Sequence, residues 1–221
     1  MNLRRIKATP ATSAIIAAIL IGFAIEIATG AWLDGEKLSQ LGAITFHDVF
    51  ERHQYWRLLS AMFLHGDGTP AGDALHLGLN LLAIYQIGSL FEVMFGTRRF
   101  LIIYFSTGLI ASLVSATMNH GASVGASGAL FGILGAFVFS VRRSPRWRHE
   151  RGAQSIVKQL VFWIVANIVV GSQIPQIDLS AHLGGLIAGF ILGILLPHDV
   201  PPPPPSQVVV DVTPARELPV E

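Results

Sequence analysis

The chain has 221 residues, of which 52% are hydrophobic and only 13% are charged, and its mean hydropathy is +0.56. A soluble domain usually carries about a quarter charged residues, so the excess apolar content must face lipid. The net charge of +1 gives no overall field that would draw the chain to nucleic acid. The absence of cysteine excludes disulfides, thiolate catalysis and cysteine-ligated metal.

Six stretches approach the roughly twenty apolar residues that are needed to cross about 30 Å of hydrocarbon. We expect them to form an all-α membrane bundle, and Lys158 and Gln159 give the fifth stretch the weakest apolar signal. The expected spans are Ser13–Trp32, Ala74–Met94, Phe100–Met118, Val124–Val141, Val157–Gly171 and Leu179–Leu196.

The remaining segments complete a predicted division into one membrane domain, residues 1–197, and a tail, residues 198–221. The first loop, about 33–73, is too long for a tight connector, so we expect it to be partly helical and interfacial. Pro201 to Pro205 open the tail, which we expect to be extended, disordered and cytoplasmic.

The basic residues predict the orientation of the spans, because lysine and arginine near the ends of spans tend to stay in the cytoplasm. Alternating the six spans leaves only Lys37, Arg52 and Arg57 on one side. We therefore expect both termini in the cytoplasm. The basic residues on the cytoplasmic side are Arg4, Arg5, Lys7, Arg98, Arg99, Arg142, Arg143, Arg146, Arg148, Arg151, Lys158 and Arg216.

The basic start of the chain followed by an apolar run also resembles a secretory signal peptide, with small residues near Ala28 to Ala31. The run is longer than the apolar region of such signals. We therefore expect it to be retained as the first span.

A small set of strongly polar residues lies inside the predicted spans, where each is costly unless it faces a cavity or a partner, and four of them lie near the starts of the second, fourth and sixth spans. His76 and Asn80 share one face of the second span, while Ser127 and His182 lie near the starts of the fourth and the sixth. These three spans run from the outer face inward, so the four side chains are expected at one depth. A hydroxyl, imidazoles and an amide at one depth predict a nucleophile, a base and oxyanion donors.

Glycines at helical spacing edge two of these spans and indicate that their backbones approach closely. Gly128, Gly132 and Gly135 follow Ser127, and Gly185, Gly189 and Gly193 follow His182. A serine such as Ser127, taken alone, is more often a packing residue, and a histidine such as His182, taken alone, is a partnered bundle histidine about half the time. The combination predicts that Ser127 and His182 come within hydrogen-bonding reach.

At these residues the sequence closely resembles the rhomboid family of intramembrane serine proteases. Five motifs over about residues 50–196, in order and at matching spacing, carry the resemblance. They are Trp56-Arg57, His76-x-x-x-Asn80, Gly88-x-x-x-Glu92-x-x-x-Gly96, Gly125-Ala126-Ser127-Gly128 and Ala181-His182-x-x-Gly185-x-x-x-Gly189.

The resemblance implies a six-helix bundle that cleaves transmembrane proteins, without cofactor or metal, at a site open to the extracytoplasmic side of a bacterial plasma membrane. It makes Ser127 the nucleophile and His182 the general base, with no acidic third member. Asn80, His76 and the backbone N–H of Ser127 become the oxyanion donors. Phe131 matches the aromatic position that packs on the base histidine.

Some features leave alternatives open. Ten residues separate His65 from His76, more than in many family members, which puts any role of His65 in doubt. Asp178 could orient the base, but capping of the last helix is favoured. Glu92 is expected to tie loops or helix ends, and Glu26 to have a structural or cavity-facing role.

Two other functions compete with proteolysis. A non-catalytic rhomboid-like binder of membrane proteins is one, although such proteins typically lack the serine or the histidine. A small transporter with a histidine proton relay is the other, and the absence of broken half-length helices in matching halves counts against it.

Overall fold

The computed structural model describes residues 9–66, 69–119, 121–174 and 176–196. Apart from one isolated β-bridge, the regular structure of these residues is helical, which confirms the predicted all-α class. The predicted tail lies outside the described residues. The long helices are α2 (Pro10–Thr29), α5 (Pro70–Ala83), α7 (Thr97–Met118), α8 (Ser127–Arg143), α9 (Arg151–Gly171) and α10 (Leu179–Leu195).

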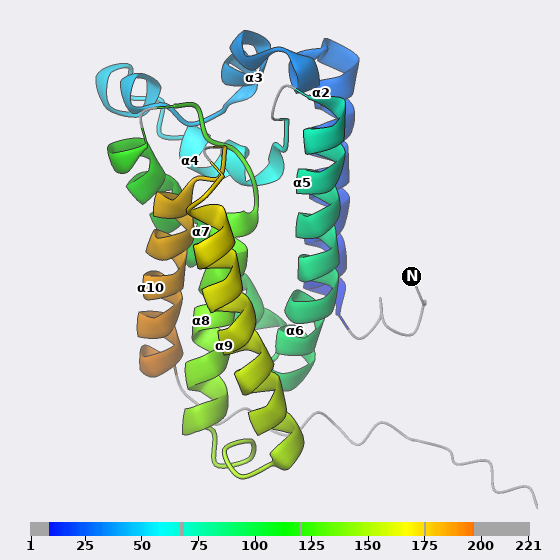
Figure 1. The fold of residues 1–221 in the computed structure, drawn as a ribbon, viewed down its shortest axis with the longest axis vertical. Helices are drawn as coiled ribbons and strands as arrows, with labels where there is room; N and C mark the ends of the chain where they lie inside the picture. The colour runs from blue at the N-terminus through cyan, green and yellow to red at the C-terminus, as the bar shows by residue number, and fades with distance from the viewer. Residues whose placement is uncertain (1–8, 67–68, 120, 175, 197–221) are drawn as a thin grey trace, which may run out of the picture.

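The second span is one helix with a local change of winding. A π-helical turn at Ile84–Gly88 joins α5 to α6 (Ser89–Phe95). Together they form a stretch of 26 residues, Pro70–Phe95, that is long and apolar enough to cross a membrane. Helix α2 lies beside this stretch and packs against it around the π-helical turn (Figure 1).

Four helical stretches of the described chain meet the length and hydropathy of a membrane span: α2, the α5–α6 stretch, α7 and α9. Helices α8 and α10 have only 17 residues each, or about 25 Å at 1.5 Å per residue. The prediction of six spans is therefore matched in four places, and the other two stretches form shorter helices.

The boundaries of the fifth stretch differ most from the prediction. Helix α9 begins at Arg151 rather than at Val157 and includes Lys158 within its second turn. Arginine and lysine are good helix formers and can extend their charged ends toward water. A hydropathy pattern detects the apolar part of such a helix and misses its basic first turns.

Helix α8 lies at the centre of the bundle, and α9 lies on its outside (Figure 1). Thirteen of the 17 residues of α8 are buried, whereas only five of the 21 residues of α9 are. The outer face of α9 carries exposed apolar side chains such as Phe162 and Trp163. Such a face suits contact with lipid.

The segment between α2 and α5 covers the end of the bundle at which α5, α8 and α10 begin (Figure 1). It is partly helical, as predicted. It contains α3 (Gly35–Leu41), α4 (Arg57–Ser60), a π-helical turn at His47–Glu51 and two 3₁₀ turns at Ala31–Leu33 and Ala61–Phe63.

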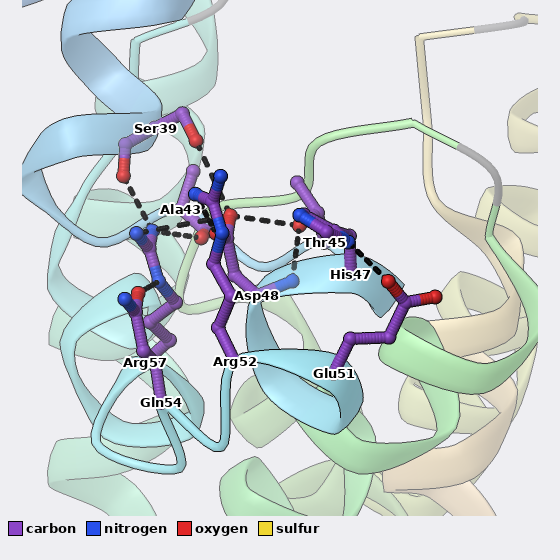
Figure 2. A network of polar contacts seen from close by, with 9 residues as sticks. All are labelled: Ser39, Ala43, Thr45, His47, Asp48, Glu51, Arg52, Gln54 and Arg57. Atoms are coloured by element: carbon purple, nitrogen blue, oxygen red, sulfur yellow. Dashed lines mark hydrogen bonds and ion pairs between the residues drawn. The ribbon is translucent and has the colours of Figure 1, made fainter.

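A buried arginine holds this segment in shape (Figure 2). The guanidinium of Arg57 donates hydrogen bonds to the carbonyl oxygens of Ser39 and Ala43 and, at 2.6 Å, to the side chain of Gln54. The group also lies 5.0 Å from the ring centre of Trp56. The Trp56-Arg57 motif therefore organises the first loop.

Asp48 is the acidic centre of the same network (Figure 2). Its carboxylate accepts hydrogen bonds from Thr45 at 2.8 Å and from Arg52 at 3.1 Å, and it lies 3.7 Å from the Arg57 guanidinium. Burial alone raises the pKa of Asp48, but the hydrogen bond from Thr45 and the positive charges of Arg57 and Arg52 outweigh it and leave the pKa below its ordinary value.

Candidate active site

Ser127 and His182 meet although they lie 55 residues apart in the chain. Ser127 is the first residue of α8, and His182 lies in the first turn of α10. The Nε2 atom of His182 lies 2.8 Å from the Ser127 Oγ atom. A hydroxyl hydrogen-bonded to an imidazole is the arrangement that activates a serine as a nucleophile.

Glycine backbones bring the two helices together. A Cβ atom at Gly185 would lie 2.0 Å from the carbonyl oxygen of Gly128, and one at Gly189 would lie 2.0 Å from that of Gly132. Any larger residue would force the helices apart. Because both pairs advance by four residues in the same direction, α8 and α10 run parallel and their first turns are adjacent.

Phe131 fixes the plane of the histidine ring. It lies one turn after Ser127, and its ring stacks on the imidazole of His182 at 4.3 Å between centres and 13° between planes. The Nδ1 atom of His182 is buried and has no hydrogen-bond partner among the described residues. The Ser127 hydroxyl and the phenyl ring therefore orient the imidazole, without an acidic third group on Nδ1.

The predicted oxyanion donors lie on α5 and at the start of α8. The amide nitrogen of Asn80 donates to the carbonyl oxygen of His76 at 2.9 Å, which leaves the second N–H of that amide. The ring of His76 lies against Gly125, where a Cβ atom would be 2.8 Å from Nε2. The N–H of Ser127 belongs to a first helical turn, whose N–H groups lack partners within the helix.

His65, whose role the sequence left in doubt, is part of this surrounding structure. Its Nε2 atom accepts a hydrogen bond of 3.3 Å from the backbone N–H of Ala126, and its ring centre lies 5.1 Å from that of His76. Burial, with the neighbouring His76, lowers the pKa of His65 to about 3. The ring is therefore neutral at ordinary pH, as a nitrogen acceptor must be.

Glu26 of α2 holds the loop that carries His65. The buried carboxylate accepts hydrogen bonds from the backbone N–H groups of His65 at 2.9 Å and Gly66 at 2.6 Å. The sequence predicted a structural or cavity-facing role for Glu26 and indicated no partner. Its partners are backbone groups, which leave no signature in a sequence.

Glu92 has a structural role at the other end of the second span. Its carboxylate accepts hydrogen bonds from the N–H groups of Ala11 and Thr12 at 3.1 and 2.8 Å, and from the Thr97 hydroxyl at 2.8 Å. It thereby caps the start of α2, which otherwise has no side-chain cap. This agrees with the expectation that Glu92 ties helix ends.

The two glycines that flank Glu92 serve the same end of the bundle. A Cβ atom at Gly88 would lie 3.2 Å from the ring of Phe100, so the residue permits close packing. Gly96 ends α6 with a φ of 90°, a conformation that favours glycine. Neither glycine is near the serine–histidine pair.

Comparison with known protein families supports the resemblance seen in the sequence. The model of the rhomboid domain matches residues 52–198. The chain is 36% identical over 178 residues to "Rhomboid protease GluP" of Bacillus subtilis, which covers 80% of this chain and 33% of that protein. It is 37% identical over 159 residues to "RHOMBOID-like protein 1" of Arabidopsis thaliana, covering 72% of this chain and 39% of that protein.

A shorter relative matches over more of its own length. The "Putative rhomboid protease YdcA" of Bacillus subtilis is 31% identical over 145 residues, covering 64% of this chain and 67% of that protein. The chain thus spans only about a third of the longer relatives named above.

Proposed function

The chain belongs to the rhomboid family, and on this premise we propose that it is a serine endopeptidase that cleaves transmembrane proteins within the bilayer. The observation that carries the proposal is the 2.8 Å contact between Ser127 Oγ and His182 Nε2. Membrane helices surround this pair, so a substrate would reach it from the lipid phase.

The proposed reaction has two acyl-transfer steps. Nε2 of His182 takes the hydroxyl proton while Ser127 Oγ attacks the peptide carbonyl, and the leaving amine then receives that proton. Water attacks the resulting acyl-enzyme, again with His182 as the base, and releases the second product. Stacking on Phe131 keeps Nε2 directed at the hydroxyl in both steps.

The negative charge on the tetrahedral carbonyl oxygen needs donors that are already in place. We assign this role to the backbone N–H of Ser127 and to the side chains of Asn80 and His76. Each such donor contributes about 2.7–4 kcal/mol to the transition state in a comparable site. The ring of His76 packs against Gly125 and the ring of His65. This packing supports the assignment, because the ring is held in place before substrate binds.

The proposed topology has six spans, both termini in the cytoplasm and the active site near the extracytoplasmic surface of a bacterial plasma membrane. Helices α8 and α10 would be the short fourth and sixth spans. Arg142 and Arg143 at the end of α8 support the orientation, because basic residues favour the cytoplasmic face.

Replacement of Ser127 by alanine in the purified full-length chain tests the proposal. In detergent, with a model transmembrane substrate, we expect Ser127→Ala to lose cleavage by a factor of at least about 10³. Ser140→Ala, a buried serine farther along the same helix, is the matched control and should retain it. Undiminished cleavage by Ser127→Ala would refute the proposal.

Covalent capture separates the protease from a non-catalytic rhomboid-like binder. A serine-reactive phosphonate should label the wild type on Ser127 and label His182→Ala far more slowly, since the base activates the nucleophile. Failure to label the wild type, together with retained binding of a membrane-protein segment, would favour the binder.

A further inference from the structure

Asp178 lies at a junction of three segments and uses both of its carboxylate oxygens. Its Oδ1 atom caps α10, accepting from the backbone N–H of Ala181 at 3.0 Å and from the hydroxyl of Ser180 at 2.5 Å. Its Oδ2 atom accepts three further hydrogen bonds, from the hydroxyl of Ser115, the amide of Asn119 at 3.1 Å and the hydroxyl of Ser123 at 2.8 Å.

The three donors to Oδ2 come from outside α10. Ser115 lies in the last turn of α7 and Asn119 directly follows that helix. Ser123 belongs to the segment that leads into Ser127. A simple helix cap needs only the Oδ1 contacts, so the Oδ2 contacts call for a separate explanation.

The segment before Ser127 is held on its other side by the first loop. Ser123 pairs with Ile44 through two backbone hydrogen bonds of 2.9 and 3.0 Å. Farther along, the N–H of Gly125 donates to the carbonyl oxygen of Ala61 at 2.8 Å. Asp178 therefore connects the segment before Ser127, through Ser123, to the start of α10, the helix that carries His182.

The charge of Asp178 suits this role. Burial raises the pKa of its carboxyl group, but the hydrogen bonds from Ser115, Ser180, Ala181 and Ser123 outweigh burial and leave the pKa below its ordinary value. The group is thus ionised at neutral pH, and hydrogen bonds to an ionised acceptor are stronger than neutral ones.

We propose that Asp178 is a positioning residue that sets the separation of Ser127 and His182 by tying the segment before the serine to the start of α10. It acts through a backbone N–H, three hydroxyl groups and the Asn119 amide. It makes no hydrogen bond to the imidazole of His182, whose Nδ1 has no partner in the described chain. The inference rests on the proposed protease function and adds to it a residue that positions the serine–histidine pair.

The variant Asp178→Asn tests the Oδ2 contacts without removing the cap of α10, because asparagine caps helices as well as aspartate does. An amide nitrogen in place of Oδ2 cannot accept the three donors. A misplacement of about 1 Å can cost about 10²-fold in rate, so we expect kcat to fall by about ten- to a hundredfold while KM stays within about twofold. The rate of phosphonate labelling of Ser127 should fall by the same factor.

The matched control is Asp34→Asn, since Asp34 caps α3 with hydrogen bonds from two backbone N–H groups and lies outside the proposed site. It should leave both rates unchanged. Active-site titration of each preparation removes any unfolded fraction from the comparison. An Asp178→Asn variant with wild-type kcat and labelling rate would overturn the proposal while leaving the protease function intact.

Ser123→Ala provides a second route if Asp178→Asn does not fold, because it removes one hydrogen bond and leaves the cap of α10 untouched. We expect a smaller loss of kcat, about three- to tenfold, and little further loss when Ser123→Ala is added to Asp178→Asn. An unchanged kcat in Ser123→Ala would contradict the proposed role of Asp178. So would a double variant whose loss of kcat equals the product of the two single losses. If the wild type itself neither cleaves nor labels, the protease proposal fails instead.

Discussion

At the scale of single residues, Gly125 meets two constraints at once. Its φ is 122°, which strains any residue with a side chain, and a Cβ atom there would lie 2.8 Å from Nε2 of His76. Strain of this kind costs about 1–3 kcal/mol. A methyl group at this position would also displace a proposed oxyanion donor.

We therefore expect Gly125→Ala to lower kcat/KM by about 10²-fold and to reduce the melting temperature in detergent by a few degrees. Gly121→Ala is the control in the same loop, because its nearest neighbour to a Cβ atom would be 3.8 Å away. Steady-state kinetics with the model substrate provide the measurement. Equal activity in the two variants would show that the backbone at Gly125 does not set the site.

Ser127 and His182 could be predicted from the sequence because each stands in a compact motif on an apolar helix, where a polar residue is conspicuous. The contacts that connect Glu26, His65 and Ala126 could not be predicted in this way. Glu26 and His65 are 39 positions apart in the sequence, and His65 and Ala126 are 61 positions apart. Both contacts depend on backbone N–H groups. Backbone donors are present at nearly every residue, so nothing in a sequence marks the ones that a carboxylate will bind.

At the scale of helices, the contact between α8 and α10 determines whether the two first turns meet. Gly189→Ala should force the helices apart, because a Cβ atom there would lie 2.0 Å from a backbone oxygen of Gly132 that cannot rotate away. Overpacking of this kind costs about 1–3 kcal/mol. We expect a lower melting temperature and at least about a tenfold loss of kcat.

Gly152→Ala tests whether the loss comes from the contact rather than from glycine itself. Gly152 lies in α9, where a Cβ atom would meet nothing within 4 Å, and alanine favours a helix by about 1 kcal/mol over glycine. This control should be as stable as the wild type or more stable. A neutral Gly189→Ala variant would mean that α8 and α10 tolerate a wider separation than the structure has.

The helices also show which parts of the bundle a hydropathy pattern can predict. A helix of the described chain overlaps each predicted stretch, and four of these helical stretches meet the length and hydropathy of a span. The hydropathy pattern missed the basic start of α9. Helices α8 and α10 have 17 residues each, so length cannot identify them as spans. What distinguishes α8 is burial inside the bundle, which depends on its neighbours rather than on its own composition.

At the scale of the whole molecule, the first loop connects the bundle to the proposed site. Arg57 binds the carbonyl oxygen of Ala43, the next residue, Ile44, pairs with Ser123, and Ser123 binds Asp178. The loop is thus continuous with the segment that precedes the nucleophile. Its stability should therefore be measurable as part of the stability of the whole chain.

The pH dependence of that stability follows from Asp48. Its pKa in the folded chain lies below the ordinary value of 3.8, so its contribution is fully present above the unfolded pKa and is lost as the pH falls through the folded pKa. Asp48→Asn removes hydrogen bonds to a charged group that are worth about 1.5–3 kcal/mol. The variant should melt lower than the wild type at pH 6–7, and the difference should shrink toward pH 3.

Glu51→Gln is the control for this measurement, because Glu51 pairs with His47 in the same loop but both side chains are more than half exposed. Exposed pairs contribute little, so this variant should follow the wild type at every pH. Thermal unfolding of the purified chain in one detergent, from pH 7 down to pH 3, tests all three proteins together. The difference in melting temperature between wild type and Asp48→Asn should shrink on acidification. If it stays constant or widens, Asp48 does not stabilise the loop through its charge.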